Sequence, residues 1–407
     1  MFNITEKKIK SKVLESEVYL PREDSFQLKE CVEEFAVGSV LDVGSGSGIL
    51  ALTAAGMASV KKVLAVDINP KAINHIKRNV KKLHSYEASK IDVIKSDLFE
   101  KVKGSFDTII FNPPYLPNDK RVKDLALDGG KNGYETIIRF LDGVNKYLTQ
   151  PGIVLLLFSS YSKKDKIDEA ILDNCLTSSL VSERKLDFET LYVYRIEKST
   201  TLRELEVNGI HNVHRFARGK RGLIFKGEYN GAEVAIKSKN PLSESENAME
   251  REYKMIDFLR NEGFHKIPKV ILTGLDFFVY EYIDGVTIED FLVSSNKCDI
   301  LDMIKNIMES MRELDVIGVN KEEMHRPHKH IIISNKNFAL IDFERCKESE
   351  KPQNVTQFCQ YITSENFKKL TSKKKIKFDK DKIMKLSRNY KKSYSDVSFK
   401  KILDIIK

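Results

Sequence analysis

Short apolar segments alternate with helical segments from residue 40 onward, and this alternation constrains the fold of the first half of the chain. Strands are predicted at 40–43, 62–66, 91–95, 106–111, 152–158 and 190–196. Helices are predicted at 27–37, 48–58, 70–84, 133–148 and 163–174. Strands that alternate with helices are typical of a parallel sheet covered on both faces. The first half is therefore predicted to be a doubly wound α/β domain.

The pattern changes after the polar stretch 198–212, which we interpret as a linker. Short alternating strands are predicted at 213–238, followed by a helix at 244–262 and two strands near 269–282. This order is typical of an antiparallel sheet. The chain is thus divided into a first domain at 1–197, the linker, an α+β domain at 213–350 and a basic helical part at 351–407.

The positive charge of the chain is concentrated at its C-terminal end. The formal net charge is +9, while residues 368–407 hold 15 Lys and Arg against 4 Asp and Glu. This balance of +11 leaves −2 for the rest of the chain. A basic segment can contact RNA or the ribosome through phosphate groups. A solvated helical face in a lysine-rich protein is the alternative interpretation.

Several features predict a cytoplasmic protein without a membrane partner. The longest apolar run, 153–158, is too short to span a bilayer. The N-terminus is charged early and lacks the apolar core of a secretion signal. The five cysteines are scattered without a CxxC pair, so neither a disulfide framework nor a cysteine metal site is expected.

A glycine-rich turn between the first strand and the next helix predicts a ligand site. Gly44, Gly46 and Gly48 allow the backbone to approach a ligand, and the helix N-terminus supplies N–H donors. Asp67 ends the second strand, where a carboxylate meets ribose hydroxyls, and Asp97 can accept from an adenine amino group. S-adenosyl-L-methionine also carries an amine and a sulfonium, which carboxylates favour electrostatically. The ordered set predicts a site for this methyl donor.

The tetrapeptide Asn112-Pro113-Pro114-Tyr115 follows the fourth strand and predicts the acceptor half of the site. The side-chain carbonyl of Asn112 and the backbone carbonyl of Pro113 can accept hydrogen bonds from a planar NH2 group. The two prolines fix φ, which holds the backbone acceptor in place. Tyr115 offers a flat face for stacking. A proline-rich turn without function is the alternative for the tetrapeptide alone.

Two acceptors remain open at this point. A glutamine side-chain amide and the exocyclic amine of adenine both present an NH2 group on an sp2 carbon. A flipped adenine in RNA or DNA would require a basic surface and a base-recognition element. The first domain shows neither in its sequence, so the protein amide is favoured.

The order of these motifs resembles that of HemK/PrmC-like glutamine methyltransferases over residues 1 to about 197. Two further segments are similar to the short archaeal and eukaryotic branch, which lacks an N-terminal helical domain. They are Tyr19-Leu-Pro-Arg-Glu-Asp-Ser25 and Leu127-Asp-Gly-Gly-Lys-Asn-Gly133. The resemblance implies a seven-stranded doubly wound sheet.

The resemblance also implies a substrate and a partner. The expected product is a methylated glutamine in a translation release factor, and a small zinc-binding activator protein often accompanies this branch. Asn112 would both contact the donor and hold the substrate. The residues implied as further donor contacts are Ser25, Asp42, Gly44, Asp67, Asp97 and Leu98.

The second half contains a series of motifs between residues 213 and 350. Gly219 and Gly222 lie in a segment similar to the kinase glycine-rich loop, and Lys237 ends the strand Glu233-Val-Ala-Ile-Lys237. Such a lysine grips nucleotide phosphates and pairs with a helix glutamate, for which Glu252 is the candidate. Asp342 in Leu340-Ile-Asp-Phe-Glu344 matches the metal-binding aspartate. The set resembles the RIO-like and archaeal small kinase-like families over about 213–350. This resemblance implies ATP with Mg or Mn.

The catalytic loop departs from the kinase pattern. No aspartate stands at the position of the catalytic base, for which Glu323 is the nearest substitute. His330 occupies the place of a metal-binding asparagine, although Mg2+ prefers oxygen ligands. An inactive kinase-like binding module and a protein serine/threonine kinase both remain open.

Overall fold

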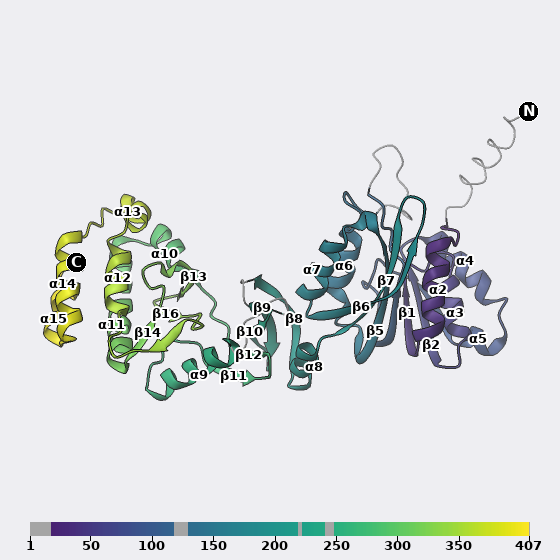
Figure 1. Cartoon of the computed structure of the whole chain (residues 1–407). Helices are drawn as coiled ribbons and strands as arrows, with labels where there is room; N and C mark the ends of the chain where they lie inside the picture. The colour runs from purple at the N-terminus through teal and green to yellow at the C-terminus, as the bar shows by residue number, and fades with distance from the viewer. Residues whose placement is uncertain (1–17, 118–128, 219–221, 241–247, 407) are drawn as a thin grey trace, which may run out of the picture. The chain divides into compact units, whose positions relative to one another are not determined.

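The computed structural model describes residues 18–117, 129–218, 222–240 and 248–406. The chain divides into two compact units, Met1–Arg215 and Phe216–Lys407. The first unit carries the larger sheet and the second carries smaller sheets followed by a helical C-terminal part (Figure 1). Each unit is described separately below.

A seven-stranded sheet forms the centre of the first unit. Its order is β3-β2-β1-β4-β5-β7-β6. The first five strands along the chain pair in parallel, whereas β7 runs antiparallel to both β5 and β6. The strands are β1 (Gly38–Val43), β2 (Val60–Asp67), β3 (Ile91–Lys95), β4 (Phe106–Phe111), β5 (Leu148–Ser159), β6 (Leu176–Lys185) and β7 (Thr190–Lys198).

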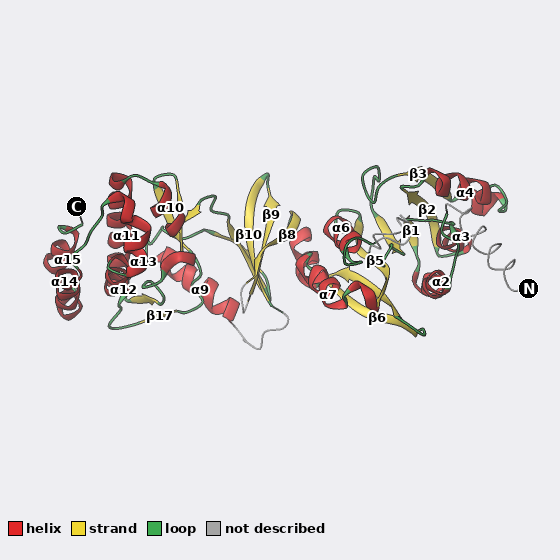
Figure 2. Cartoon of the chain, turned by 90° about the horizontal axis from the view of Figure 1, so that it is seen from above, coloured by secondary structure: helices red, strands yellow, loops and turns green. Residues whose placement is uncertain are grey.

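Helices cover both faces of this sheet (Figure 2). On β4, Ile110 belongs to the core cluster that includes α2 and α3, while Phe111 packs against Phe140 of α6 in a tilted arrangement with ring centroids 4.5 Å apart. Successive strand residues point to opposite faces, so the doubly wound arrangement is confirmed. The helices are α2 (Glu23–Phe35), α3 (Ile49–Gly56), α4 (Pro70–Val80), α5 (Ser85–Ser89), α6 (Glu135–Val144), α7 (Lys164–Asp173) and α8 (Thr200–Val207).

The structure differs from the sequence-based pattern in two places of the first unit. Strand β6 has no counterpart among the strands predicted from periodicity, because most of its side chains are exposed at the sheet edge. Residues 198–212, expected to be a linker, contain α8 and the start of β8. The helix is held to the unit by the buried side chains of Leu202 and Leu205.

A five-stranded sheet has the order β11-β12-β10-β9-β8. Four of its strands belong to the second unit, whereas β8 begins before the boundary at Arg215 and ends after it. The strands of this sheet are β8 (Ile210–Arg218), β9 (Gly222–Tyr229), β10 (Ala232–Lys239), β11 (Val270–Thr273) and β12 (Phe277–Glu281), with α9 (Ala248–Asn261) between β10 and β11. Smaller sheets join β13 (Val286–Thr287), β15 (Ile331–Ser334) and β16 (Asn337–Leu340), and β14 (Val319–Lys321) with β17 (Cys346–Glu348). The antiparallel pairing agrees with the sequence pattern.

The C-terminal helices share one core with the rest of the second unit. Ile383, Tyr390, Phe399 and Ile402 belong to the same buried cluster as Met311 of α11. The helices are α10 (Ile288–Ser294), α11 (Lys297–Ile317), α12 (Asn354–Ile362), α13 (Glu365–Thr371), α14 (Lys380–Ser393) and α15 (Asp396–Leu403). Among the residues that the structure describes, no helix combines the length and apolar character needed to cross a membrane.

Candidate active site

The carboxyl ends of four parallel strands bring the predicted methyl-donor residues to one edge of the sheet. Val43 is paired with Val66 on β2 and with Phe111 on β4, and Asp67 is paired with Lys95 on β3. The glycine turn, Asp67, Asp97 and the Asn112 loop therefore begin at the same level of the sheet. Ligands of open α/β sheets bind at this edge.

The turn after β1 depends on backbone conformations that favour glycine. Gly44, Gly46 and Gly48 have φ of 63°, 51° and 84°. At Gly48 a Cβ would also lie 3.0 Å from Cγ1 of Ile76 on α4. The amide of Gly48 donates to the carbonyl of Ser45 at 2.7 Å, which closes the turn before α3 begins.

Two buried aspartates hold this turn. Asp42 is fully buried, and its Oδ2 accepts from the amide of Ala51 in the first turn of α3 at 3.1 Å. Burial raises the pKa of Asp42 to about 7. Asp67 accepts from the amides of Gly46 and Asn69, each at 2.8 Å, and burial raises its pKa as well. The contact of Asp42 with the helix amide is a structural role that its sequence position did not suggest.

Asp97 and Leu98 lie in the connection after β3. Oδ2 of Asp97 is 3.0 Å from Nη2 of Arg139, and both side chains are partly exposed. Leu98 has φ of 42°, and its carbonyl accepts from the hydroxyl of Ser96 at 3.0 Å. The strained backbone conformation at Leu98 is thus supported by a neighbouring side chain.

Asn112 is oriented by a residue that the sequence interpretation did not single out. Its Nδ2 donates to Oδ2 of Asp24 at 2.9 Å, and Asp24 is only 2% exposed. Oδ1 of Asp24 accepts from the hydroxyls of Tyr19 at 3.1 Å and Ser25 at 3.3 Å. Oδ2 of Asp24 is an acceptor, so it selects the NH2 end of the Asn112 amide, the end that can donate a hydrogen bond. Asp24 thereby determines which end of Asn112 faces the ligand side.

The other end of the Asn112 amide is a buried acceptor without a partner. Its Oδ1 has no hydrogen bond within the described part of the chain. Leaving a buried acceptor unsatisfied costs about 1–3 kcal/mol. A small pocket at this position is lined by Tyr19, Asp24, Asn112, Pro113, Pro114, Tyr115 and Leu116. A ligand N–H donor that enters the pocket would complete the hydrogen bonding of Asn112.

The glycine segment 129–133 packs directly against the Asn112 loop. A Cβ on Gly129 would lie 2.6 Å from the carbonyl oxygen of Pro114, and one on Gly133 would lie 2.6 Å from that of Tyr115. The amide of Gly129 donates to the carbonyl of Leu116 at 2.9 Å. Glycine is therefore needed at both positions, because a side chain would collide with the backbone of the Asn112 loop. Leu127 and Asp128, the first two residues of the predicted segment, lie outside the described residues.

In the second unit, Lys237 lies between two carboxylates. Its Nζ is 2.6 Å from Oε2 of Glu252 on α9 and 3.1 Å from Oδ1 of Asp342. Burial alone would lower the pKa of Lys237, but the neighbouring carboxylates of Glu252 and Asp342 raise it. Glu252 also accepts from the amide of Phe343 at 3.0 Å. The structure thus brings together Lys237, Glu252 and Asp342, three residues far apart in sequence.

The segment around Asp342 is held by Lys321, which the sequence interpretation missed. Lys321 is 1% exposed and donates to the carbonyls of Ile341, at 2.8 Å, and Asp342. Asp342 has φ of 60°, so its backbone is strained where this lysine supports it. Lys321 lies on the three-residue strand β14, which is too short for a pattern of apolar residues to show that the lysine is buried.

Glu323 and His330 form a second cluster beside Asp342. Glu323 pairs with Arg345 at 2.6 Å and with Nε2 of His330 at 3.2 Å. Nδ1 of His330 is buried without a hydrogen bond and lies 3.9 Å from Oδ2 of Asp342. Burial lowers the pKa of His330, which favours the neutral imidazole.

These residues do not form a suitable Mg2+ site. Among the described residues, no group of three or more His, Cys, Asp and Glu side chains is placed to hold a metal ion. Oδ1 of Asp342 is already engaged by Lys237, and an imidazole stands where an oxygen ligand would be needed. Gly219 lies outside the described residues. Gly222 begins β9, where a Cβ would lie 3.3 Å from the carbonyl oxygen of Ser238.

Comparison with known proteins places the first unit among methyltransferases. The family described as methyltransferase small domain matches residues 24–178. A Methanocaldococcus jannaschii protein, named as a candidate protein N5-glutamine methyltransferase, is 36% identical over 185 residues. That match covers 44% of this chain and 91% of the relative. The release factor glutamine methyltransferase of Koribacter versatilis is 34% identical over 172 residues, covering 38% of this chain and 60% of that protein.

Among solved structures, the Mtq2–Trm112 complex of E. cuniculi, described as methylating the translation termination factor eRF1, contains a similar chain. It shares 25% identity, covers 45% of this chain and 99% of its own, and has a TM-score of 0.37. The seven-stranded sheet, the residues gathered at its edge and the extent of the Methanocaldococcus match agree with one another. Through its first unit, the chain belongs to the HemK/PrmC-like family of S-adenosyl-L-methionine-dependent glutamine methyltransferases.

Proposed function

We propose that the first unit methylates the side-chain amide of a glutamine in a translation release factor. The observation that carries the proposal is the amide of Asn112, whose Nδ2 is engaged by Asp24 while its buried Oδ1 lacks a partner. A planar NH2 group supplies the donor that this acceptor needs. The name of the Koribacter relative supports a release factor as substrate.

S-adenosyl-L-methionine, when bound, supplies an activated methyl group. The two N–H groups of the glutamine amide donate hydrogen bonds to Oδ1 of Asn112 and to the backbone carbonyl of Pro113. These contacts would hold the amide nitrogen, whose lone pair is delocalised and weakly nucleophilic, in one orientation for the transfer. The donor's sulfur–methyl bond would break as the nitrogen–methyl bond forms, and one amide proton would be released to solvent. Tyr115 stacks on the amide plane. Positioning and electrostatics supply the rate, and no strongly basic residue is required.

The test uses purified protein, labelled methyl donor and candidate release factors, with the modified residue located by mass spectrometry. Asn112→Ala should lower kcat by about 100-fold or more, since an acceptor that positions the reacting nitrogen is removed. Donor binding should change little. Asn74→Ala, an exposed asparagine on α4, is the matched control. Transfer to adenine in RNA or DNA, with none to protein, would establish the alternative acceptor instead.

A small zinc-binding activator protein is included in this proposal as a partner. It rests on the resemblance of residues 19–25 and 127–133 to the short branch of the family. Co-purification from the source cells, with zinc analysis of the bound protein, tests it. Full activity of the isolated chain on release factor would contradict a need for the activator.

We further propose that the second unit is a kinase-like nucleotide-binding module. Lys237, ion-paired with Glu252 and next to Asp342, supports this assignment, because this arrangement suits a lysine that receives nucleotide phosphates. The residues present do not suit Mg2+, so we expect ATP to bind without appreciable turnover. Binding of a fluorescent ATP analogue should be lost in Lys237→Ala and retained in Lys239→Ala. ATP turnover that needs both Lys237 and Asp342 would identify an active kinase instead.

A further inference from the structure

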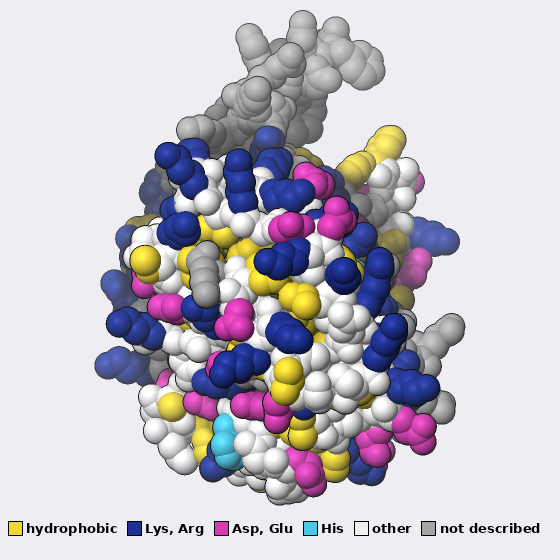
Figure 3. All heavy atoms as spheres, turned by 90° about the vertical axis from the view of Figure 1, so that its left-hand side faces the viewer, with side chains coloured by type: hydrophobic (Ala, Val, Ile, Leu, Met, Phe, Trp, Pro, Cys, Tyr) yellow, Lys and Arg dark blue, Asp and Glu magenta, His cyan; other side chains and the backbone are white. Residues whose placement is uncertain are grey.

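Exposed basic side chains cover the C-terminal helices of the second unit. Between residues 369 and 401, twelve Lys and Arg side chains are exposed, against three Asp in the same interval. None of the twelve has an ion pair with an acidic side chain in the described residues. We call this surface the lysine face. Figure 3 views the molecule from the side of α14 and α15 and shows Lys and Arg side chains spread over it.

The helices that carry the lysine face are fixed in position. Tyr390 of α14 is fully buried, and its hydroxyl donates to Asp315 of α11 at 2.9 Å. Arg312 of α11 lies over the ring of Tyr390 and donates to the carbonyl of Tyr394. Ile383, Phe399 and Ile402 bury the inner sides of α14 and α15. The lysine face is therefore a preformed surface rather than a flexible tail.

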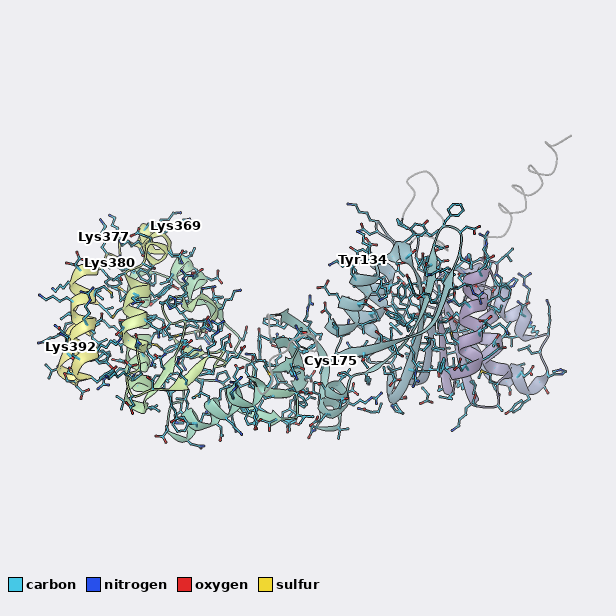
Figure 4. The ribbon with its side chains drawn as sticks, viewed as in Figure 1. Tyr134, Cys175, Lys369, Lys377, Lys380 and Lys392 are labelled. Carbon is cyan, nitrogen blue, oxygen red and sulfur yellow. The ribbon has the colours of Figure 1, made fainter. Side chains whose placement is uncertain are left out.

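The cations are distributed over several elements of this surface. Lys369 lies on α13, Lys377 lies in the connection to α14, and Lys380 and Lys392 lie at opposite ends of α14 (Figure 4). At 1.5 Å per residue, the 14 residues of α14 span about 21 Å. The lysine face can thus contact several successive phosphate groups of an extended polyanion.

The composition of the lysine face argues against a membrane surface and against single-stranded nucleic acid as its binding partner. In the described residues 365–406, Val397 is the single large apolar side chain that is strongly exposed. Helices that bind lipid surfaces need an apolar face, and here the apolar faces are buried in the core. Proteins that bind single-stranded nucleic acid use exposed aromatic side chains for base stacking, and Phe378, Tyr390 and Phe399 are all buried.

We propose that the lysine face binds the phosphate backbone of double-helical RNA. Lysine is a flexible point charge suited to phosphate contacts, whereas the planar groups of Arg, Asn and Gln are better suited to bidentate contacts with base edges. On the exposed side of α14, Arg388 and Asn389 are the residues of the latter kind. A broad face of short helices fits the wide, shallow minor groove of A-form RNA, which is recognised by shape and phosphates. Insertion of one helix into the major groove of DNA needs base-reading side chains that this face largely lacks.

The experiment measures binding of the full chain to a fluorescent RNA duplex of about 24 base pairs over a range of salt concentrations. Wild type should bind with log K falling linearly against log salt, because phosphate contacts release counterions. The quadruple variant Lys369→Gln, Lys377→Gln, Lys380→Gln, Lys392→Gln should lose about tenfold or more in affinity at 150 mM salt. Its salt slope should be shallower. Circular dichroism should be unchanged, since all four side chains are exposed.

The matched control removes the same number of exposed charges from the first unit, at Lys61, Lys77, Lys81 and Lys82. It should bind the duplex as wild type does. Equal loss in both variants, or no binding by wild type, would overturn the proposal. Equally tight binding of a DNA duplex of the same sequence would overturn the choice of RNA. Preferential binding of anionic phospholipid vesicles or polyglutamate would assign the surface to another partner. Because the lysine face lies outside the methyl-transfer site, these outcomes do not depend on the methyl acceptor.

Discussion

The two candidate sites differ in whether their central polar group already has partners in the described structure. In the first unit, Asn112 keeps a buried acceptor without a partner. In the second unit, the ammonium of Lys237 is engaged by two carboxylates. A ligand that donates to Asn112 satisfies a buried acceptor, and leaving such an acceptor unsatisfied costs about 1–3 kcal/mol. A nucleotide phosphate, by contrast, must compete with Glu252 and Asp342 for Lys237. The first site is therefore arranged to gain free energy from an incoming NH2 group, and the second is arranged for stability of the unliganded unit.

The largest effect is expected when the ion pair between Lys237 and Glu252 in the second unit is broken. Lys237→Met should lower the free energy of unfolding of this unit by about 3–5 kcal/mol, because it leaves the buried carboxylate of Glu252 without its partner. The chain contains no Trp, so hydrogen exchange resolved by peptide is the suitable measurement for each unit. Lys237→Met combined with Glu252→Leu should recover much of the loss. Equal stability of the single variant and wild type would show that the ion pair does not stabilise the unit.

A second prediction tests how the first unit tolerates a buried acid. The pKa of Asp42 rises from 3.8 to about 7 in the folded state. The folded state therefore holds the proton more tightly than the unfolded state, and stability should fall as pH rises from about 4 to 7. The loss is at most about 4 kcal/mol at 1.36 kcal/mol per pKa unit. Asp42→Asn should reduce this pH dependence in hydrogen exchange of β1 and leave the part contributed by Asp67, whose pKa burial also raises. Asp92→Asn, an exposed control, should keep the full pH dependence. A pH dependence as large in Asp42→Asn as in wild type would contradict the assignment.

The smallest expected effect tests whether Asp24 positions the side-chain amide of Asn112. Asp24→Ala should lower kcat by about 10- to 100-fold, about 1.4–2.7 kcal/mol, since the Asn112 amide loses the contact that selects its orientation. Donor affinity should stay within about threefold. Asp24→Asn retains one acceptor oxygen and should recover part of kcat, and Glu23→Gln, at the exposed neighbouring position, is the control. A change confined to KM would indicate a binding role for Asp24 rather than an orienting one.

The sequence predicted the parts of the molecule that depend on local periodicity or glycine chemistry. The buried strands β1 and β4, the turn at residues 44–48 and the Asn112 loop all have such signals. Strand β6 lacks one because it lies at the sheet edge with mostly exposed side chains. The polar stretch 198–212 concealed α8, which is fixed by Leu202 and Leu205.

Interactions between residues distant in sequence could not be predicted in this way. Asp24 appears in sequence as an acidic residue at the start of a helix, yet its partner Asn112 is 88 positions away. Lys321 appears as a polar residue on a short strand, although it is buried beneath the Asp342 segment. Lysines are so frequent in the C-terminal part that the apolar residues anchoring α14 and α15 give only a weak periodic signal. The sequence therefore predicts a separate basic region there. No local pattern encodes these long-range contacts.

The hydrogen bond between Asp24 and Asn112 also makes the acceptor site sensitive to partial opening of the fold. Asp24 lies in the first turn of α2, a helix packed against the sheet, whereas Asn112 follows the central strand β4. A helix packed on the face of a sheet can open locally with a smaller free energy than the central strands. Detachment of α2 alone would free the Asn112 amide while the sheet and the glycine turn stayed intact. Methyl transfer would then be lost on warming before the central strands exchange their amide protons, and it would return when α2 docks again.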